Sequence, residues 1–551
     1  MSVLNSFLDD LLEAPLKELL LKLCSKECNQ DLSPTEPPRL PPVTCMVTDV
    51  GMSKYTLDVA EEMGIPAVSL ETSGACGMMG YLQTRQLLDK GIIPLRDSSY
   101  LTNGYLDMAI DWIPSLKGIR LKDMPTFESI PDCADDPKDI MSVLNSFLDD
   151  LLEAPLKELL LKLGSKECNQ DLSPTEPPRL PPVTCMVTDV GMSKYTLDVA
   201  EEMGIPAVSL ETSGACGMMG YLQTRQLLDK GIIPLRDSSC LTNGYLDMAV
   251  DWIPSLKGIR LKDLPTSIRT IDQNDKMMNH VMSSEYRALK SRAVLINTFA
   301  TLEQNVLKEL SSFSPNIYPI GPLNLLVNHI PKDDNIIGPT TSCEEDIEYI
   351  QWLDSQEPNS VLYVNFGTLA MLTQEQLVEL SWGLANSHQK FIWVARSNLS
   401  IGGSKPLPLE FEEEIKERGI LLSWCDQEMV LGHSSIGGFV THCGWNSMIE
   451  SISNGVPMIC WPFFADQGTN GWYCCNYLGL GIDMSEATKR DEIERMIKEL
   501  MEGNKGKDMK KRAIEWRKLA KEATMNSHGS SYANLESIVN NVLLSNDHIV
   551  P

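Results

Sequence analysis

The stretch of sequence that decides the fold is residues 424–467, WCDQEMVLGHSSIGGFVTHCGWNSMIESISNGVPMICWPFFADQ. Its residues 438–441 form an apolar run typical of a short strand, and this run ends in the polar segment 442–445. A helix is expected to follow and to end near Gly455, because glycine readily takes the left-handed conformation that closes a helix. A second apolar strand is expected at residues 457–461. This order predicts a strand–helix–strand unit of an α/β sheet.

Polar side chains collect at two points of this unit, one after each strand. His442 follows the first strand, and Asp466 and Gln467 follow the second. Ligands of open α/β sheets bind where strands end. The N-terminus of a helix also offers unpaired N–H groups and a partial positive charge, which suit a diphosphate. The stretch therefore predicts half of a nucleotide site.

The same stretch resembles the 44-residue donor-binding box of the plant family-1 UDP-glycosyltransferases, with at least ten positions matching at fixed spacing. The resemblance implies that one aromatic side chain stacks on the uracil and that others bind the ribose, the diphosphate and the sugar. These residues are Trp424 for the uracil, Gln427 and Glu450 for the ribose, His442, Asn446 and Ser447 for the diphosphate, and Trp445, Asp466 and Gln467 for the sugar hydroxyls, with Gly444 in the same loop.

One position departs from the family pattern. Asp426 stands where the family usually has a proline, two residues after the first tryptophan of the box. We expect the uracil loop to be looser as a result and the carboxylate of Asp426 to face water.

The composition excludes several classes of partner. The chain has 551 residues and a formal net charge of −28 at pH 7. Nucleic acids and anionic membranes bind basic surfaces, so neither is an expected partner. No apolar run reaches the ~18–20 residues that span a bilayer, and the acidic first residues lack the basic region of a signal peptide. Fifteen cysteines, an odd number, fit a reducing compartment, so we expect a cytoplasmic protein.

The first half of the chain contains a near-identical repeat. Residues 1–126 and 141–266 align at an offset of 140, and solenoid repeats are usually shorter and more divergent. The repeat therefore indicates a duplicated piece of a gene or a mis-joined gene model. Residues 127–140 resemble the segment that precedes such a copy in the family, so we expect the second copy to begin at Phe127 and the first to be a partial duplicate. Only four positions differ between the copies, namely Cys24/Gly164, Tyr100/Cys240, Ile110/Val250 and Met124/Leu264.

Each copy carries an apolar strand that ends in an acidic residue, Asp189 in the second copy and Asp49 in the first. A helix near residues 194–203 and a strand at 207–210 follow, a rhythm that implies a parallel sheet. From its position after a strand, Asp189 is expected to cap the next helix. Residues 185–264 resemble the acceptor domain of the same family, and this resemblance implies instead that Asp189 orients a catalytic histidine.

A second domain is expected after an irregular, proline-rich linker at residues 321–343. It opens with a strand at 361–366 and a tight turn whose glycine lets the backbone approach a phosphate closely. The resemblance implies that Thr368 contacts that phosphate. The next helix is expected to start with a capping box formed by Thr373 and Gln376.

Five further elements are expected, four of them along this domain. Residues 293–298 (in the first domain) and 390–394 read as strands, residues 490–501 and 508–523 as charged helices, and residues 531–544 as a final helix that resembles the closing helix of the family.

The sequence lacks the general base that the resemblance implies. Transfer to an alcohol needs the hydroxyl deprotonated as it attacks the anomeric carbon, and in the family a histidine oriented by the aspartate plays this part. All seven histidines lie at or beyond residue 280. We expect His280 and His329 to be surface residues, while His442 is assigned to the diphosphate. Asp189 is expected to be solvated, with a pKa near its reference value of ~4, and therefore a weak substitute.

Two alternatives to an active transferase remain open. The first is a catalytically impaired UDP-sugar-binding remnant, a fused or mis-joined gene copy, which the absence of the base histidine favours. The second is a nicotinamide-dependent Rossmann enzyme, which predicts G-x-G-x-x-G after a strand and an acidic residue ~20 positions later. The sequence contains no such fingerprint.

These features predict an α/β protein of the GT-B type, with two Rossmann-like domains facing a cleft and the first domain incomplete. The implied function is inverting transfer of glucose from UDP-glucose to a hydroxyl of a small lipophilic acceptor, without a metal or other cofactor, by a monomer. The expected parts are a partial duplicate at 1–126, an acceptor domain at 127–325, a UDP-sugar domain at 340–530, and a closing helix and tail at 531–551.

Overall fold

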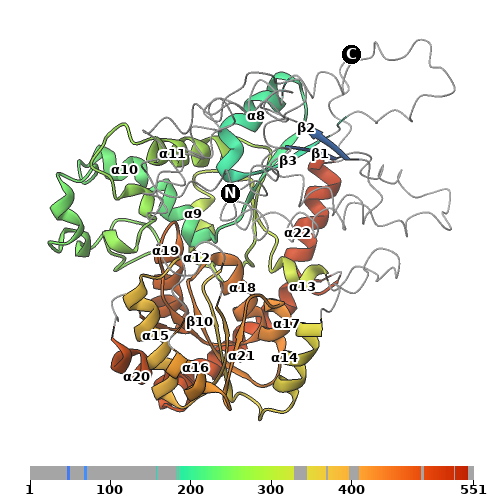
Figure 1. Ribbon diagram of the computed structural model, residues 1–551. Coiled ribbons are helices and arrows are strands. Elements are labelled where there is room, and N and C mark those ends of the chain that lie inside the picture. Colours follow the sequence, from blue (N-terminus) through green and yellow to red (C-terminus); the bar gives the residue numbers. More distant parts are fainter. Residues whose placement is uncertain are drawn as a thin grey trace, which may run out of the picture. The chain divides into compact units, whose positions relative to one another are not determined.

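The computed structural model divides the chain into two compact units, one comprising Met1–Leu8 and Thr44–Pro182, the other Asp9–Val43 and Val183–Pro551. This division does not coincide with the boundary predicted at residues 126 and 127. The colours of Figure 1 follow the chain through both units. The structure describes residues 46–49, 67–70, 157, 183, 185–327, 344–367, 370–395, 407, 409–484, 489–526 and 528–543.

The strands described in the first unit form one parallel pair, β1 (Met46–Asp49) and β2 (Ala67–Leu70). Met46 lies opposite Ala67 in this pair. The second unit contains the same pair 140 residues later, where Met186 lies opposite Ala207. The repeated sequence thus forms the same strand pairing in both units.

The first sheet of the second unit has four parallel strands in the order β3-β4-β5-β6. Three of them confirm strands predicted from apolar runs, and β3 lies at an edge of this sheet in the described part of the chain. The fourth strand, with the short sequence IYP, was not predicted. The strands are β3 (Met186–Asp189), β4 (Ala207–Glu211), β5 (Val294–Ile296) and β6 (Ile317–Pro319).

Helices connect and cover the strands of this sheet (Figure 1). One of them, α13 (Leu323–Val327), lies where the sequence predicted an irregular linker, so the start of that prediction is wrong. The other helices are α8 (Ser193–Glu202), α9 (Ala215–Leu222), α10 (Thr224–Asp229), α11 (Lys276–Ala288) and α12 (Gln304–Leu310), with short 3-10 turns η8 (Val190–Met192), η9 (Ser238–Leu241), η10 (Tyr245–Asp247), η11 (Leu261–Asp263) and η12 (Thr266–Ile268).

The second sheet has six parallel strands in the order β12-β11-β10-β7-β8-β9. From β7 the chain adds β8 and β9 on one side of the sheet, and from β10 it adds β11 and β12 on the other side. The order in which strands are added therefore reverses between β7 and β10. Such a switch point is where doubly wound sheets bind ligands. The strands are β7 (Val361–Asn365), β8 (Lys390–Val394), β9 (Gly419–Leu422), β10 (Ile436–Thr441), β11 (Met458–Cys460) and β12 (Gly481–Asp483).

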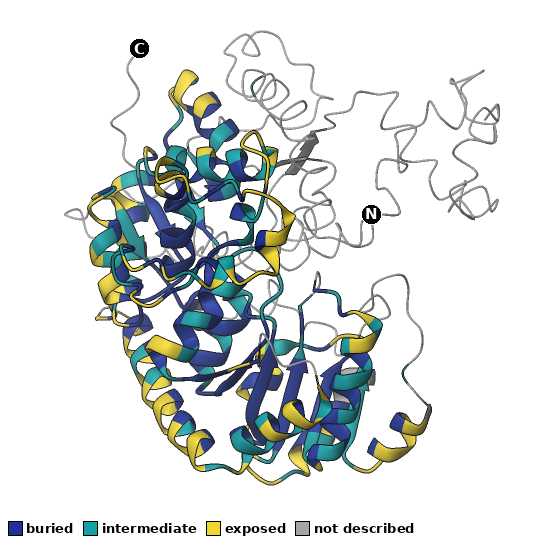
Figure 2. Ribbon diagram, turned by 90° about the vertical axis from the view of Figure 1, so that its left-hand side faces the viewer, coloured by how far each residue is buried: buried dark blue, intermediate teal, exposed yellow. Residues whose placement is uncertain are grey.

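The inner strands of both sheets are buried between helices whose outer faces are exposed (Figure 2). The predicted capping box is confirmed, because Thr373 and Gln376 cap the same helix start. Within the described residues, no helix is both long and apolar enough to cross a bilayer. The helices are α14 (Glu344–Asp354), α15 (Gln374–Ser387), α16 (Leu409–Ile415), α17 (Gln427–Gly432), α18 (Trp445–Asn454), α19 (Gln467–Tyr473), α20 (Arg490–Met501), α21 (Asn504–Thr524) and α22 (Ser530–Ile538), with π-helical turns at Cys474–Leu478 and Val539–Leu543.

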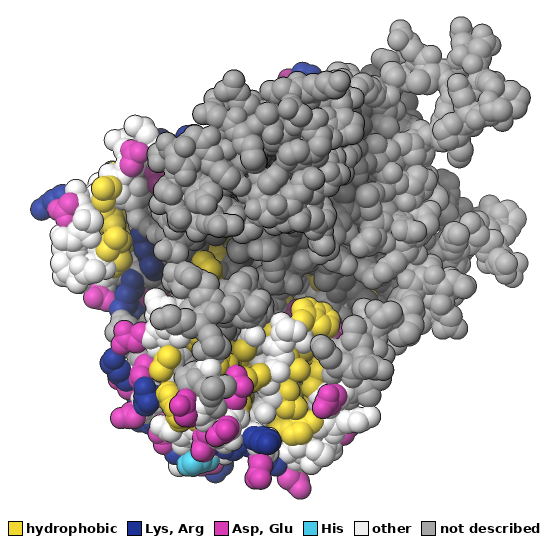
Figure 3. Space-filling view, viewed as in Figure 1, with side chains coloured by type: hydrophobic (Ala, Val, Ile, Leu, Met, Phe, Trp, Pro, Cys, Tyr) yellow, Lys and Arg dark blue, Asp and Glu magenta, His cyan; other side chains and the backbone are white. Residues whose placement is uncertain are grey.

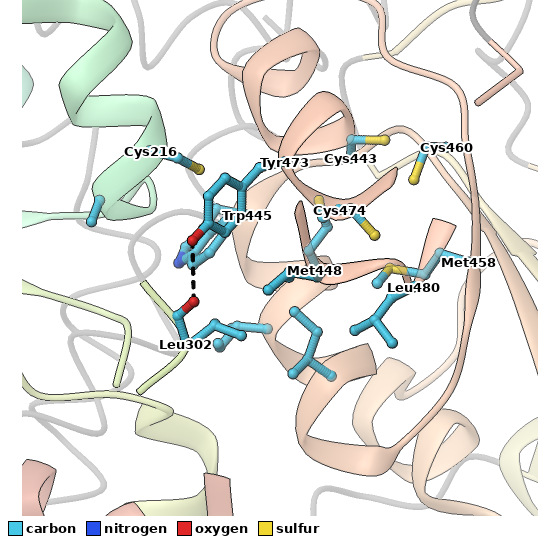
Figure 4. Close-up of a cluster of buried hydrophobic side chains, with 14 of the residues drawn as sticks. Cys216, Leu302, Cys443, Trp445, Met448, Met458, Cys460, Tyr473, Cys474 and Leu480 are labelled. Atoms are coloured by element: carbon cyan, nitrogen blue, oxygen red, sulfur yellow. Dashed lines mark hydrogen bonds between the residues drawn. The ribbon is translucent and has the colours of Figure 1, made fainter. Parts of the chain in front are cut away.

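One cluster of buried apolar side chains joins the two halves of this unit. It includes Cys216 and Leu302 from the first half and Trp445 and Tyr473 from the second. Figure 4 shows Trp445 and Tyr473 reaching toward the segments that carry Cys216 and Leu302, and the Tyr473 hydroxyl donates to the Leu302 carbonyl over 3.2 Å. The two sheets are therefore linked by a shared core.

The last helix, α22, returns to the first sheet. Its Ser531 hydroxyl donates to the Gly321 carbonyl at 2.6 Å, and the Asn534 amide donates to the Pro319 carbonyl at 2.9 Å. Leu535 and Ile538 lie in the same apolar cluster as Val208 and Leu295 of that sheet. The C-terminal helix thus ties the end of the chain to the first half of the unit.

Candidate active site

The loop between β10 and α18 provides a helix start without a side-chain cap. Thr441 ends β10, Cys443 has a positive φ of 68°, and α18 begins at Trp445 after Gly444. No side chain accepts a hydrogen bond at this helix start, so its first N–H groups remain for a ligand. An uncapped helix start at a switch point suits a diphosphate. The helix ends at Gly455, whose φ of 72° confirms the predicted cap.

His442 is fixed between two glycines at this loop. A Cβ atom on Gly367 would lie 2.7 Å from the imidazole, and one on Gly444 would lie closer still. Gly367 also has a φ of 63°, a conformation that favours glycine. The ring therefore rests against backbone at the ends of β7 and β10, the two strands of the switch point.

A hydrogen-bond network joins α17 to α18 beside this loop. The Gln427 amide donates to Glu450 Oε2 at 2.8 Å and to the Ser447 hydroxyl at 2.9 Å. Its own oxygen accepts from Asn365 Nδ2 at 2.9 Å. The structure thus brings Gln427, Ser447 and Glu450 together. Asn365, which the sequence analysis missed, connects them to β7.

Trp424 and Asp426 lie at the entrance to the same helix pair. The Trp424 side chain is 63% exposed, which leaves a ring face open to a base. Asp426 is the N-cap of α17 and accepts the Met429 N–H at 2.9 Å. This contact favours a firm helix start rather than a loosened loop, because a capping aspartate stabilises the start of its helix. Asp426 is also partly exposed, in keeping with a carboxylate that faces water.

The side chain of Trp445 packs inside the protein. The indole is buried, and its N–H donates to the Asn297 carbonyl at 2.7 Å. A Cβ atom on Gly214 would lie 2.7 Å from the ring, so the ring packs against the start of α9. The side-chain oxygen of Asn446 accepts from Asn297 at 3.4 Å. A sugar contact by Trp445 would therefore come from its backbone N–H.

Asp466 and Gln467 lie at the start of α19. The Gln467 oxygen accepts the N–H groups of Phe463 and Phe464 at 2.9 and 3.1 Å. Asp466 accepts from Asn470 at 2.8 Å, and burial raises the pKa of its carboxyl above the usual value. Both side chains are held in place by neighbours at the end of the second strand of the box.

Asp189 occupies the end of β3. Its Oδ1 accepts the Gly191 N–H at 2.7 Å, so the predicted capping role is confirmed at the turn η8, and its Oδ2 accepts from Thr212 at 3.2 Å. The expectation of a solvated carboxylate was wrong, because burial raises the pKa of Asp189 while these two hydrogen bonds oppose the rise. In the described part of the chain, both bonds go to residues other than histidine.

His280 is buried, and the expectation of a surface position was wrong. It is 8% exposed, and its Nδ1 lies 3.3 Å from the Tyr195 hydroxyl. The two rings are stacked with centroids 5.6 Å apart. Two other residues of the sequence analysis, Thr368 and His329, lie outside the described residues.

Comparison with known proteins decides the family. Residues 236–524 match the family model described as UDP-glucoronosyl and UDP-glucosyl transferase. The chain belongs to this family. The predicted membership and the predicted GT-B architecture of two Rossmann-like domains are both confirmed.

Two similar relatives are plant glucosyltransferases. The 7-deoxyloganetin glucosyltransferase of Catharanthus roseus is 47% identical over 430 residues, which are 77% of this chain and 85% of that protein. The (R)-mandelonitrile beta-glucosyltransferase of Prunus dulcis is 47% identical over 444 residues, which are 79% of this chain and 87% of that protein.

One solved structure from another plant has the same fold as this chain. It is a UDP-glucosyltransferase from Polygonum tinctorium capable of glucosylating indoxyl, in a complex with 3,4-dichloroaniline. It is similar with a TM-score of 0.62 and 26% identity, covering 92% of this chain and all of that one.

One acidic residue of this transferase was missed by the sequence analysis. Glu211 ends β4 and is only 4% exposed. Its Oε1 accepts the Ser213 N–H at 2.8 Å, whereas its Oε2 is buried without a hydrogen-bond partner. Burial is the main cause that raises the pKa of Glu211 to about 8. The signal was available, since Glu211 follows an apolar strand as Asp189 does.

On the face in Figure 3, charged side chains of both signs lie among hydrophobic and other side chains of the described residues. Among the described residues, no three His, Cys, Asp or Glu side chains are grouped so that they could hold a metal ion. The acidic residues at the ends of β3 and β4 are therefore not arranged as a metal centre.

Proposed function

We propose that this chain transfers glucose from UDP-glucose to a hydroxyl group of a small lipophilic acceptor. The observation that carries the proposal is the network of Gln427, Ser447 and Glu450 beside the uncapped start of α18. It provides hydrogen-bonding side chains for a ribose next to N–H groups for a diphosphate. The two relatives above, both glucosyltransferases of small organic molecules by name, support the choice of sugar and acceptor class.

The proposed donor contacts follow from these positions. The exposed face of Trp424 takes the uracil, and Gln427 and Glu450 take the ribose hydroxyls. The helix start at Gly444 and the ring of His442 face the diphosphate, with Asn446, Ser447 and Thr368 as further contacts. Asp466, Gln467 and the backbone N–H of Trp445 bind the sugar hydroxyls. These roles belong to the UDP-sugar domain that we propose at residues 340–530.

The proposed stereochemistry is inversion. UDP-glucose carries its glucose in the α configuration, so an acceptor hydroxyl that attacks from the opposite face forms a β-glucoside. The relative from Prunus dulcis is named a beta-glucosyltransferase, which supports this outcome. The charge of the leaving UDP would be met by the N-terminus of α18 and by His442, so we expect no requirement for a metal.

Incubation of the full chain with UDP-glucose and hydroxylated acceptors tests the function. Mandelonitrile and an iridoid alcohol are suitable acceptors, and galactose from UDP-galactose is the matched competitor. We expect a β-glucoside, identified by its anomeric proton coupling, at equal rates with and without a chelator. An α-glucoside, a loss of activity with the chelator, or a preference for UDP-galactose would each contradict part of the proposal.

A second candidate is a UDP-sugar-binding protein without turnover. The observation in its favour is that the hydrogen bonds of Asp189 go to Gly191 and Thr212, while no histidine precedes residue 280 in the sequence. Calorimetry separates the two candidates. Binding of UDP-glucose without any glucoside from a broad panel of alcohols would favour this second function.

We also propose that the chain is a monomer and that it is located in the cytoplasm. The eight cysteines in the described part of the chain are all free thiols, in keeping with a reducing compartment. Sedimentation of the purified chain and localisation of a fluorescent fusion in plant cells test the two statements. A stable dimer, or a fusion confined to a membrane compartment, would contradict them.

A further inference from the structure

The loop that leads from β11 to α19 contains an alanine in an unusual backbone conformation. Ala465 has a φ of 53°, a left-handed value that residues with a side chain rarely adopt. It directly precedes Asp466 and Gln467, the two residues assigned above to the sugar hydroxyls. Strained backbone of this kind persists only where its neighbours hold it, and it concentrates at functional sites.

One residue from the first half of the unit binds both main-chain groups of Ala465. The Thr266 N–H donates to the Ala465 carbonyl at 3.0 Å, and the Ala465 N–H donates to the Thr266 hydroxyl at 2.9 Å. The two residues are 199 positions apart in the sequence. The conformation of the loop is thus fixed from the other half of the unit, by a residue at the start of η12.

The segment that carries Thr266 lies along the start of α19. The Thr469 hydroxyl donates to the Asp263 carbonyl at 2.8 Å. A Cβ atom on Gly468 would lie 3.1 Å from the same carbonyl oxygen, which is a tight contact. The two halves therefore meet backbone to backbone directly beside the loop.

Side chains of the same segment support Thr266 from below. The guanidinium of Arg260 donates to both carboxylate oxygens of Asp263, at 2.9 and 3.0 Å. Arg269 donates to the Lys262 carbonyl at 2.7 Å. Bidentate pairs between arginine and a carboxylate add geometric specificity as well as energy, so Thr266 extends from a well-defined support.

Thr266 completes a set of hydrogen bonds that the loop does not complete by itself. The Gln467 oxygen accepts the N–H groups of Phe463 and Phe464. The N–H of Ala465, the next in the loop, goes to Thr266 instead. Two N–H donors occupy the lone pairs of the amide oxygen, so the NH2 group of Gln467 is the part of this side chain that can bind a sugar. The position of that NH2 group therefore depends on a loop that Thr266 anchors.

Resting on the proposed glucosyl transfer, we infer that Thr266 is a positioning residue for the sugar of UDP-glucose. It holds Ala465 in the left-handed conformation that presents Asp466 and Gln467 to the sugar hydroxyls. The contacts proposed for the uracil, the ribose and the diphosphate lie elsewhere, at α17 and at the start of α18. Loss of the Thr266 hydroxyl should therefore weaken recognition of the glucosyl group and leave recognition of UDP unchanged.

Thr266→Val in the full chain tests the inference, because valine has the shape of threonine but lacks the hydroxyl acceptor. We expect the affinity for UDP-glucose, measured by calorimetry, to fall about 3–10-fold, the usual effect of one lost hydrogen bond. The affinity for UDP should stay at the wild-type value. Thr266→Ser keeps the hydroxyl and should bind both ligands as wild type does. Unchanged affinity for UDP-glucose in Thr266→Val, or equal losses for UDP and UDP-glucose, would overturn the inference.

Two further variants separate positioning of the loop from simple attachment of the two halves. Thr469→Val removes the hydroxyl donor to Asp263, which is also a bond between the halves, but leaves the hydrogen bonds of Ala465 intact. We expect a lower melting temperature without a specific loss of affinity for UDP-glucose, and a loss as large as that of Thr266→Val would contradict the positioning role. Thr126→Val makes the same change as Thr266→Val in the repeated sequence and should leave both affinities unchanged. A wild-type chain that binds neither UDP nor UDP-glucose would contradict the proposed function itself, and this outcome needs no variant to recognise.

Discussion

At the scale of the residue, glycines decide where the polar groups of the site lie. Gly367 and Gly444 leave room for the ring of His442, and Gly214 leaves room for the ring of Trp445. A methyl group at any of these positions would meet a ring atom at less than van der Waals distance. The geometry of the donor site thus depends on the absence of side chains as much as on the polar groups themselves.

Gly367→Ala should weaken UDP binding. The new Cβ would lie 2.7 Å from His442 and would also adopt a left-handed backbone, which costs roughly 1–2 kcal/mol. Gly204→Ala is the matched control, since Gly204 has a φ of 64° and nothing within 4 Å of its Cβ position. We expect both variants to lose stability and only Gly367→Ala to lose affinity in calorimetry. Equal affinity in the two variants would contradict the assignment of this turn to the donor site.

Trp424→Ala should weaken UDP binding by about 1–3 kcal/mol, the usual contribution of a base stacked on an aromatic ring. Because the side chain is 63% exposed, its loss should leave the melting temperature unchanged. Ile514→Ala removes another exposed apolar side chain, 44% exposed, from α21 and should leave UDP affinity unchanged. Unaltered binding by Trp424→Ala would exclude this ring as the uracil platform.

At the scale of the element, side chains from different sources satisfy the N–H groups at several helix starts. Thr373 and Gln376 cap α15, and Asp426 caps α17. The start of α9 follows Gly214, which has no side chain, and Glu303 of another segment accepts the N–H groups of Ala215 and Cys216 instead. By contrast α18, the helix assigned to the diphosphate, has no side-chain cap.

Thr373→Ala should lower the free energy of unfolding by about 0.5–2 kcal/mol, the usual cost of losing an N-cap. The Thr373 hydroxyl accepts the Gln376 N–H at 3.1 Å, and alanine cannot replace it. Thr373→Ser keeps the hydroxyl and is the control. Denaturant titration should give serine the wild-type value, and an alanine variant as stable as wild type would show that this cap contributes nothing.

At the scale of the whole molecule, burying acids between the two sheets makes stability depend on pH. The folded-state pKa of Glu211 is raised from 4.5 to about 8, and that of Glu285 is also raised, chiefly by burial. The folded protein therefore binds more protons than the unfolded chain between these values. Unfolding free energy falls with increasing pH wherever this holds. The stabilisation is complete below the unfolded pKa and is lost as pH rises through about 8.

The melting temperature should accordingly decrease between pH 5 and pH 9 (a range that spans the raised pKa of Glu211). Glu211→Gln cannot ionise and should show a smaller decrease. Glu71→Gln, its counterpart in the repeat, should follow the wild-type curve. A Glu211→Gln curve that coincides with wild type would show that Glu211 is not desolvated in the folded protein.

The sequence by itself determined the family, the α/β class and most of the strands and helices of the second domain. It could do so because apolar runs, capping residues and the 44-residue box are local patterns, and local patterns depend on neighbours along the chain. Strand β8 and helix α20 have the predicted bounds for this reason.

Only the tertiary structure decided which side chains are desolvated and which segments far apart in sequence meet. The burial of His280, the burial that raises the pKa of Glu211 and the contact between Trp445 and Asn297 all contradict or extend what sequence positions indicated. Burial and electrostatic coupling depend on distances through space, and strands or helices that lie hundreds of residues apart set those distances. Position along the chain therefore could not show that Glu211 and His280 are desolvated, whereas the fold does.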